Sequence, residues 1–167
     1  DDAVALHRAG RFSEAAVAYE AVLERTPEQV DAWQLLGLVR HKLGRADAAL
    51  EALDRAVQLD AGHAAAWANR GLVLRALERP DEAAASFRQA TELRPGFREP
   101  LLNLARLEAA RGDLTAARRA GEEAAEHHPD DPESLRLVGL LRARTGELGG
   151  AATAWGRALR LAPDPGL

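Results

Sequence analysis

Two asparagines, Asn69 and Asn103, stand thirty-four residues apart and are the side chains best suited to hold a peptide. An asparagine amide carries both donors and an acceptor, so it can bond to a peptide main chain whatever the sequence of that peptide. Amides at a regular interval could therefore hold an extended segment. The alternative is that these two amides cap or brace neighbouring helices.

The histidines do not form a pattern typical of a metal or catalytic site. His7 and His41 are also thirty-four residues apart. Equivalent residues of adjacent helical repeats lie on the order of 10 Å apart, too far to share an ion with bonds of about 2 Å. His127 and His128 lie in a polar stretch that favours solvated loop residues. The chain has no cysteine and no GxSxG, GxxxxGK[ST] or HExxH motif, so we predict no enzyme activity, metal site or cofactor.

The interval of thirty-four residues recurs through the whole chain. One phase of this period is always alanine, at Ala15, Ala49, Ala83, Ala117 and Ala151. Another phase is large and is interrupted once: Tyr19, Leu53, Phe87, Gly121 and Trp155. This regularity is typical of one structural unit stacked on copies of itself, with contacts too close for a larger side chain at the alanines.

Within each period the repeated positions have the spacing of one helix face, as at residues 33, 36, 37 and 40. Glycine just past a helix end is the usual stop, and it separates the two halves of a period at Gly10, Gly44, Gly112 and Gly146. The third period has Glu78-Arg79-Pro80 instead, where proline can open the next helix. We expect two helices of about fourteen residues per period, and nine full helices after a shortened first segment.

These residues resemble the tetratricopeptide repeat family. The family pattern is carried by Trp33-Gln34-Leu35-Leu36-Gly37 and, at later positions of the pattern, by Ala83, Phe87 and Pro95. The resemblance covers essentially the whole chain and implies an all-α fold, a right-handed superhelical solenoid of antiparallel helix pairs. We predict a single domain over residues 1–167, with a partial repeat at 1–29 and full repeats at 30–63, 64–97, 98–131 and 132–165.

In proteins of this family the first helices of successive repeats line a concave face, whose inward residues hold the ligand. Transferring that face to this sequence gives ten candidate ligand-binding residues: Leu38, His41, Lys42, Asn69, Leu72, Arg75, Asn103, Arg106, Arg136 and Arg144. The family's O-linked N-acetylglucosamine transferases use an asparagine ladder here, and its chaperone-binding members clamp a terminal carboxylate with asparagines and basic residues. This chain has asparagine at two positions of the ladder, Asn69 and Asn103, and only some of the basic residues of the clamp.

The basic residues of this face would make it locally positive on a protein whose net charge is −4. Because the planar arginine fork suits carboxylates, we expect an acidic segment or a C-terminus as the ligand. The alternative is that these arginines are solvated surface residues. The acidic pI of about 5.8 argues against nucleic acid, and no apolar run approaches the eighteen or so residues of a membrane span.

Three functions follow from these patterns. The first is a protein–protein interaction scaffold that binds a peptide or protein segment in its concave groove. The second is the substrate-recruiting arm of a larger enzyme, such as a glycosyltransferase or sulfotransferase. The third is a self-assembling structural module, which associates through uncapped ends because the final helix carries Trp155, Leu159 and Leu161.

The ends and the composition of the chain bear on its source. The chain lacks methionine and stops at Asp164-Pro165-Gly166-Leu167, so we interpret it as a module excised from a longer protein. The compartment stays open between cytoplasm and periplasm, and the preference for arginine over lysine suits a GC-rich bacterial genome.

Two departures from the columns test the assigned register. Gly121 removes a large side chain, so we expect the fourth repeat to be the weakest, or a neighbour to fill the space. Arg40, Arg70, Glu108 and Arg142 replace apolar residues. Because charges are rarely buried alone, each should reach solvent or a partner, and Glu108 and Arg142 could bridge adjacent repeats.

Overall fold

The computed structural model describes residues 2–162, and within them the chain forms ten helices and no strand. The helices are α1 (Asp2–Arg8), α2 (Phe12–Arg25), α3 (Val30–Lys42), α4 (Ala46–Leu59), α5 (Ala64–Ala76), α6 (Pro80–Leu93), α7 (Arg98–Arg111), α8 (Leu114–His127), α9 (Pro132–Arg144) and α10 (Leu148–Leu161). The short α1 followed by nine longer helices confirms the expected number. The segment Asp164–Leu167, where we expected a further repeat or linker to begin, lies outside the described residues.

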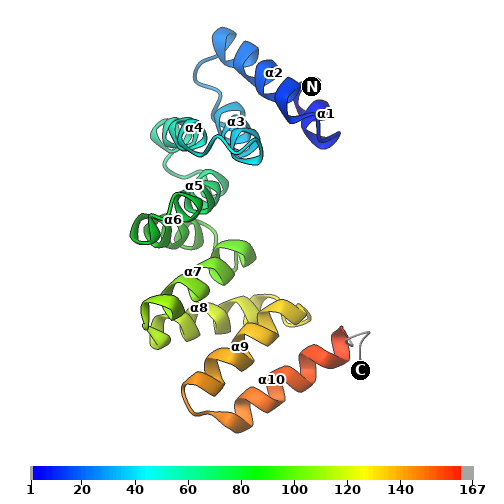
Figure 1. The fold of residues 1–167 in the computed structure, drawn as a ribbon, viewed down its shortest axis with the longest axis vertical. Coiled ribbons are helices and arrows are strands. Elements are labelled where there is room, and N and C mark those ends of the chain that lie inside the picture. The colour runs from blue at the N-terminus through cyan, green and yellow to red at the C-terminus, as the bar shows by residue number, and fades with distance from the viewer. Residues whose placement is uncertain (1, 163–167) are drawn as a thin grey trace. The chain divides into compact units, whose positions relative to one another are not determined.

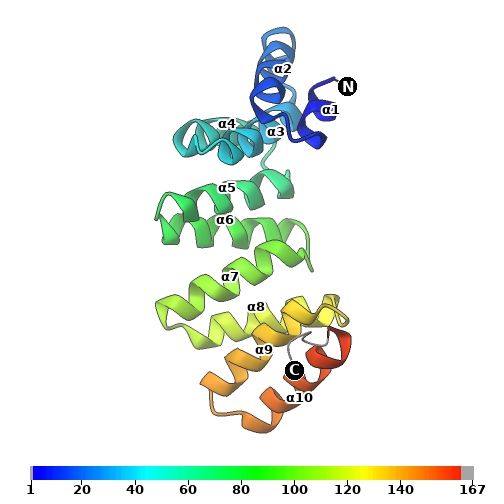
Figure 2. The same cartoon turned by 45° about the vertical axis from the view of Figure 1, so that its right-hand side comes forward.

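Consecutive helices form antiparallel pairs joined by tight turns, as the two views in Figures 1 and 2 show. α3 packs on α4, α5 on α6, α7 on α8, and α9 on α10. The predicted all-α solenoid of helix pairs is confirmed. The chain divides into two compact units, Asp1–Leu93 and Arg94–Leu167, and each is described by itself. The boundaries of a single domain and of its repeats stay a prediction.

The turns inside the pairs need a left-handed backbone. Gly10, Gly44, Gly112 and Gly146 have φ between 74° and 86°, a region that glycine enters without steric cost. Glu78 occupies the same place in the third repeat with φ of 57°. In this turn a residue with a Cβ atom therefore adopts the left-handed conformation that glycine adopts in the other four turns.

The small columns permit close packing of the two helices in a pair. The five alanines at residues 15, 49, 83, 117 and 151 are all 0% exposed. A Cβ atom on Gly37 would lie 2.5 Å from Leu53 Cγ, and one on Gly71 would lie 2.6 Å from Phe87 Cε1. Because real Cβ contacts are wider than this, glycine in the first helix and a large residue in the second are matched to each other.

Gly121 is buried in α8, and the neighbouring helix fills the space beside it. Leu141 Cδ1 of α9 lies 3.0 Å from the place where a Cβ on Gly121 would be. This is the second of the two outcomes expected for the interrupted column.

Each of the charged residues in apolar columns has a partner. The partners are Glu20 for Arg40 (2.9 Å), Asp54 for Arg70 (2.6 Å), Glu122 for Arg142 (2.9 Å) and Arg111 for Glu108 (3.6 Å). Glu108 is only 3% exposed. The expected bridge between Glu108 and Arg142 does not form, because Arg142 reaches back to Glu122 on α8 and not to α7.

Candidate peptide-binding surfaces

In the first unit, the first helices α3 and α5 pack against each other and bring together six of the ten candidate residues. These six residues form what we term the α3–α5 surface: Leu38, His41, Lys42, Asn69, Leu72 and Arg75. Spacings of three and four residues place each set on one helix face. Lys42 and Arg75 are exposed, and the other four side chains are partly buried. The surface thus combines apolar contact area with an amide and two cations.

The α3–α5 surface carries a positive field. Burial, followed by the positive charges of Lys42 and Arg75, lowers the pKa of His41 below its ordinary value of 6.5. Burial and Lys42 also lower the pKa of His7 on α1, whose Nδ1 lies 3.5 Å from the Tyr19 hydroxyl. At neutral pH both imidazoles are therefore mostly uncharged, and Lys42 and Arg75 supply the positive charge.

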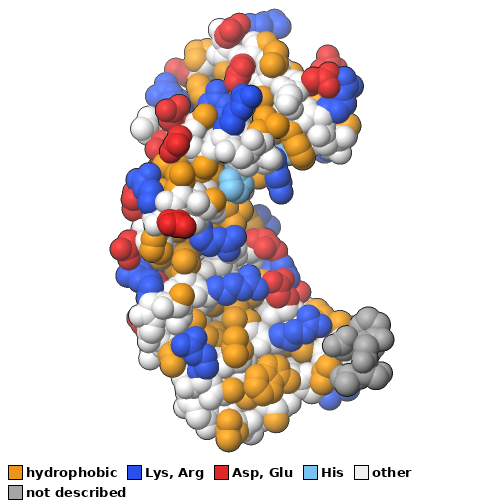
Figure 3. Space-filling view, viewed as in Figure 1, with side chains coloured by type: hydrophobic (Ala, Val, Ile, Leu, Met, Phe, Trp, Pro, Cys, Tyr) orange, Lys and Arg blue, Asp and Glu red, His pale blue; other side chains and the backbone are white. Residues whose placement is uncertain are grey.

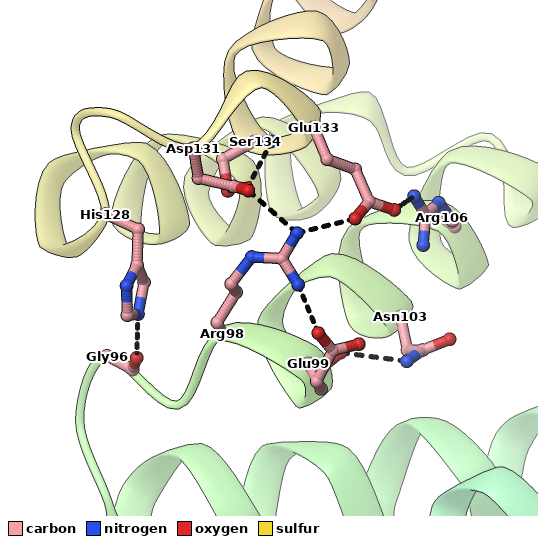
Figure 4. Close-up of polar contacts among 9 residues, drawn as sticks. All are labelled: Gly96, Arg98, Glu99, Asn103, Arg106, His128, Asp131, Glu133 and Ser134. Carbon is pink, nitrogen blue, oxygen red and sulfur yellow. Dashed lines mark hydrogen bonds and ion pairs between the residues drawn. The ribbon is translucent and has the colours of Figure 1, made fainter. Parts of the chain in front are cut away.

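In the second unit, Asn103 lies on α7 and is only 4% exposed. Its Nδ2 donates to the carbonyl of Glu99, one helical turn earlier, at 2.8 Å (Figure 4). This is the bracing role that was the alternative to ligand contact. Asn69, at the equivalent position of α5, is less buried.

An ion-pair network joins α7 to the start of α9, and we term it the α7–α9 network (Figure 4). Arg98 Nη2 donates to Asp131 Oδ1 at 2.9 Å and to Glu133 Oε2 at 2.6 Å. The second oxygen of Glu133 accepts from Arg106 Nη2 at 2.5 Å. Arg106, a candidate ligand residue, is therefore already paired with a carboxylate.

The network shifts the acidity of its carboxyl groups. Burial raises the pKa of Asp131, but hydrogen bonds from Arg98 and from Ser134 outweigh it and bring the pKa to about 2. A hydrogen bond from Arg106, partly opposed by burial, lowers the pKa of Glu133. Asp131 is also the N-cap of α9, because its side chain accepts from the Ser134 amide at 2.8 Å. Asp131 and Glu133 are therefore ionised at neutral pH, and their charges are used in contacts within the fold.

Arg98 is not among the site residues predicted from the sequence. Its column contains Val30, Ala64 and Pro132, so one arginine among uncharged residues was the available signal. His128 was expected in a solvated loop, but it is partly buried with Nε2 2.8 Å from the carbonyl of Gly96. The remaining candidates, Arg136 and Arg144, are exposed, and Arg144 donates to the Ala109 carbonyl at 3.4 Å.

The sequence itself matches known families. Family models described as tetratricopeptide repeat match residues 2–64, 42–96 and 74–141. The chain belongs to the tetratricopeptide repeat family. A comparison with curated proteins finds no match.

Solved structures of other tetratricopeptide repeat proteins have the same fold. A crystal structure of MamA is 23% identical, with a TM-score of 0.86 over 96% of this chain and 94% of that one. YrrB, described as a protein with an unusual peptide-binding site, is 21% identical, with a TM-score of 0.78 over 98% and 84%. The pilF protein of Pseudomonas aeruginosa is 20% identical, with a TM-score of 0.87 over 97% and 74%.

Within residues 2–162 there is no group of three His, Asp or Glu side chains placed to hold a metal ion. In the same residues no helix is both long and apolar enough to cross a membrane. A hollow of about 530 Å³ opens along α8, and none of the ten candidate residues lines it.

Proposed function

We propose that this chain is a protein-interaction scaffold that binds an extended peptide along its first helices, and that the α3–α5 surface is the principal contact. The observation that carries the proposal is the juxtaposition of Leu38, Leu72 and Asn69 with two exposed cations on neighbouring helices. Apolar side chains supply contact area, and the amide can bond to the peptide main chain. Membership of the family supports a binding role, because tetratricopeptide repeats are generally non-enzymatic interaction modules.

The proposed ligand is acidic or ends in a free carboxylate. Burial, and after it the charges of Lys42 and Arg75, lowers the pKa of His41, which is consistent with both cations acting across this surface. An anionic group placed there would gain charge-assisted hydrogen bonds. In the second unit the charge of Arg106 is met by Glu133, so the first unit is the better place for an anionic ligand.

A peptide library with acidic and amidated members, titrated against two double variants, tests this function. Asn69→Ala with Leu72→Ala, both on α5, should weaken binding with little loss of fold, since both side chains are only partly buried. Lys42→Ala with Arg75→Ala should remove most of the salt sensitivity, because salt screens exposed charges. Arg55→Ala, an exposed arginine on the second helix α4, is the matched control. Unchanged affinity in both double variants would refute the proposed surface.

A further inference from the structure

The last described helix, α10, presents an apolar stripe to solvent. Leu148, Trp155 and Leu159 are 70%, 38% and 48% exposed, and Ala152 between them is exposed as well. Positions i, i+4, i+7 and i+11 fall on one helix face, so these four residues form what we term the α10 stripe. Figure 3 shows hydrophobic side chains gathered over α9 and α10.

The repeat register shows what kind of element fits the α10 stripe. The equivalent residues of α2 are Phe12, Ala16, Tyr19 and Leu23. In the first unit they pack against three apolar residues of α3: Ala32, Leu36 and Val39. Tyr19 and Leu23 are consequently only 3% and 6% exposed. The shape that matches the stripe is therefore a helix with apolar residues at i, i+4 and i+7.

Charge distinguishes the α10 stripe from three of the junctions between repeats. At three junctions an acidic residue of the second helix pairs with an arginine of the next first helix: Glu20 with Arg40, Asp54 with Arg70, and Glu122 with Arg142. The three acidic residues share one column, whose other members are Arg88 in α6 and Gly156 in α10. An arginine supplied by an incoming helix would therefore have no carboxylate at this position.

The rim of the α10 stripe also has the opposite sign. The column of Glu24, Glu92 and Glu126 ends in Arg160, which is exposed and lies one helical turn after Gly156. Arg157 is not part of this rim, because it faces back toward α8 and α9, where it lines a hollow with Glu126 and Leu135 and reaches Asp130 at 3.4 Å. The surroundings of the stripe thus favour an incoming helix with carboxylates beside its apolar face.

We propose that the α10 stripe docks an amphipathic helix of a protein partner, with acidic residues flanking an apolar i, i+4, i+7 face. The apolar face would cover Trp155 and Leu159 as α3 covers Tyr19 and Leu23 on α2. A flanking carboxylate would meet Arg160. This surface lies on a second helix, so it is distinct from the α3–α5 surface and does not depend on peptide binding there.

The probe for this site is a stapled 15-residue helical peptide with alanine, leucine and valine at the spacing of Ala32, Leu36 and Val39 on an otherwise polar helix. One version carries glutamate at the position that matches Arg40, and the other carries arginine. Fluorescence anisotropy with the 167-residue chain should show the glutamate version binding about tenfold more tightly, a difference of about 1.4 kcal/mol. Equal binding of the two versions would overturn the proposal.

Variants on exposed positions separate this site from others while preserving the fold. Leu159→Ser should weaken the glutamate peptide about tenfold, and Arg160→Glu should reverse the preference between the two peptides. Val17→Ser, at a 66% exposed apolar residue outside the stripe, and Lys42→Ala on the α3–α5 surface should change nothing. Circular dichroism verifies that each variant keeps its helix content.

The remaining outcome concerns a second copy of the chain. If sedimentation shows a dimer that Leu159→Ser dissociates, while neither peptide binds, the stripe is an interface between copies and the proposal is wrong. A monomer that binds the glutamate peptide, with the sensitivity to Leu159 and Arg160 described above, supports it. Either result leaves the function proposed for the α3–α5 surface to be judged by its own variants.

Discussion

Glu78 is the residue at which this chain departs from its own turn pattern. Its φ of 57° lies in the left-handed region, which is occupied by glycine at the same turn of the other repeats: Gly10, Gly44, Gly112 and Gly146. Because a Cβ is disfavoured there, Glu78→Gly should raise the free energy of unfolding by about 1 kcal/mol. Urea denaturation measures the change. Glu78→Ala is the control and should give no such gain, since it retains the Cβ; equal stabilisation by alanine would assign the effect to the glutamate charge.

Asp131 makes a pH-dependent contribution to stability. It caps α9 and accepts from Arg98 at 2.9 Å, so Asp131→Ala should lower the free energy of unfolding by about 1–2 kcal/mol at pH 7. Its pKa is about 2 in the fold and ordinarily 3.8. The folded state therefore favours the carboxylate, and the contribution is present above pH 4 and lost as the pH falls toward 2.

The measurement for Asp131 is urea unfolding of both proteins from pH 7 to pH 2. The two curves of stability against pH should converge at the acid end. Asp130→Ala provides the control, because Asp130 is exposed and makes one long contact of 3.4 Å to Arg157. A loss that stays constant down to pH 2 would show that the charge of Asp131 is not what stabilises α9.

Contacts made by single residues are the part of this structure that the sequence predicts least well. The alanine and glycine columns could be recognised in the sequence because every repeat requires a small residue at these positions. The pairing of Arg98 with Asp131 and Glu133 occurs in one repeat only, so it leaves no periodic pattern in the sequence. Asn103 shows a further limit: the sequence gives its type and phase, but not that its amide donates to the carbonyl of Glu99.

At the scale of elements, α8 is the helix that differs most from its counterparts. Gly121 withdraws a large side chain from its column, and glycine inside a helix costs roughly 0.5–1 kcal/mol relative to alanine. Leu141 fills part of the space from α9. We expect the amides of α8 to exchange with solvent faster than those of α6, whose Phe87 is fully buried. Hydrogen exchange with mass analysis compares the two helices, and equal or slower exchange in α8 would contradict local weakness.

Helix positions could be predicted from the sequence, whereas contacts between helices were predicted only in part. Glycine stops and Pro80 mark element boundaries through backbone sterics alone, so nine full helices were expected and found. Arg142 pairs with Glu122 of α8, whereas the separation of one repeat had suggested Glu108. The choice between them depends on rotamers that spacing does not encode.

At the scale of the whole molecule, a strict period determines the architecture but not the distribution of charge. Each unit repeats the same pairing of small and large residues, which is why the fold followed from the columns. The cations of the candidate face vary from repeat to repeat. Lys42 is exposed beside His41 in the first unit, whereas Arg106 in the second unit meets Glu133 at 2.5 Å. Equivalent positions therefore differ in the charge they offer to a ligand.

This difference predicts an unequal contribution of the two units to binding an acidic peptide. Lys42→Ala should weaken binding by roughly two- to fivefold, the range for one exposed ion pair, and should reduce the dependence on salt. Arg106→Ala should have a smaller effect, because its charge is already offset by Glu133 and its loss leaves that carboxylate to Arg98. Calorimetric titration at two salt concentrations measures both variants, with Arg55→Ala as the control for a distant surface charge. If Arg106→Ala weakened binding more than Lys42→Ala, the ligand would have to displace Glu133, and the second unit would be the principal anion contact.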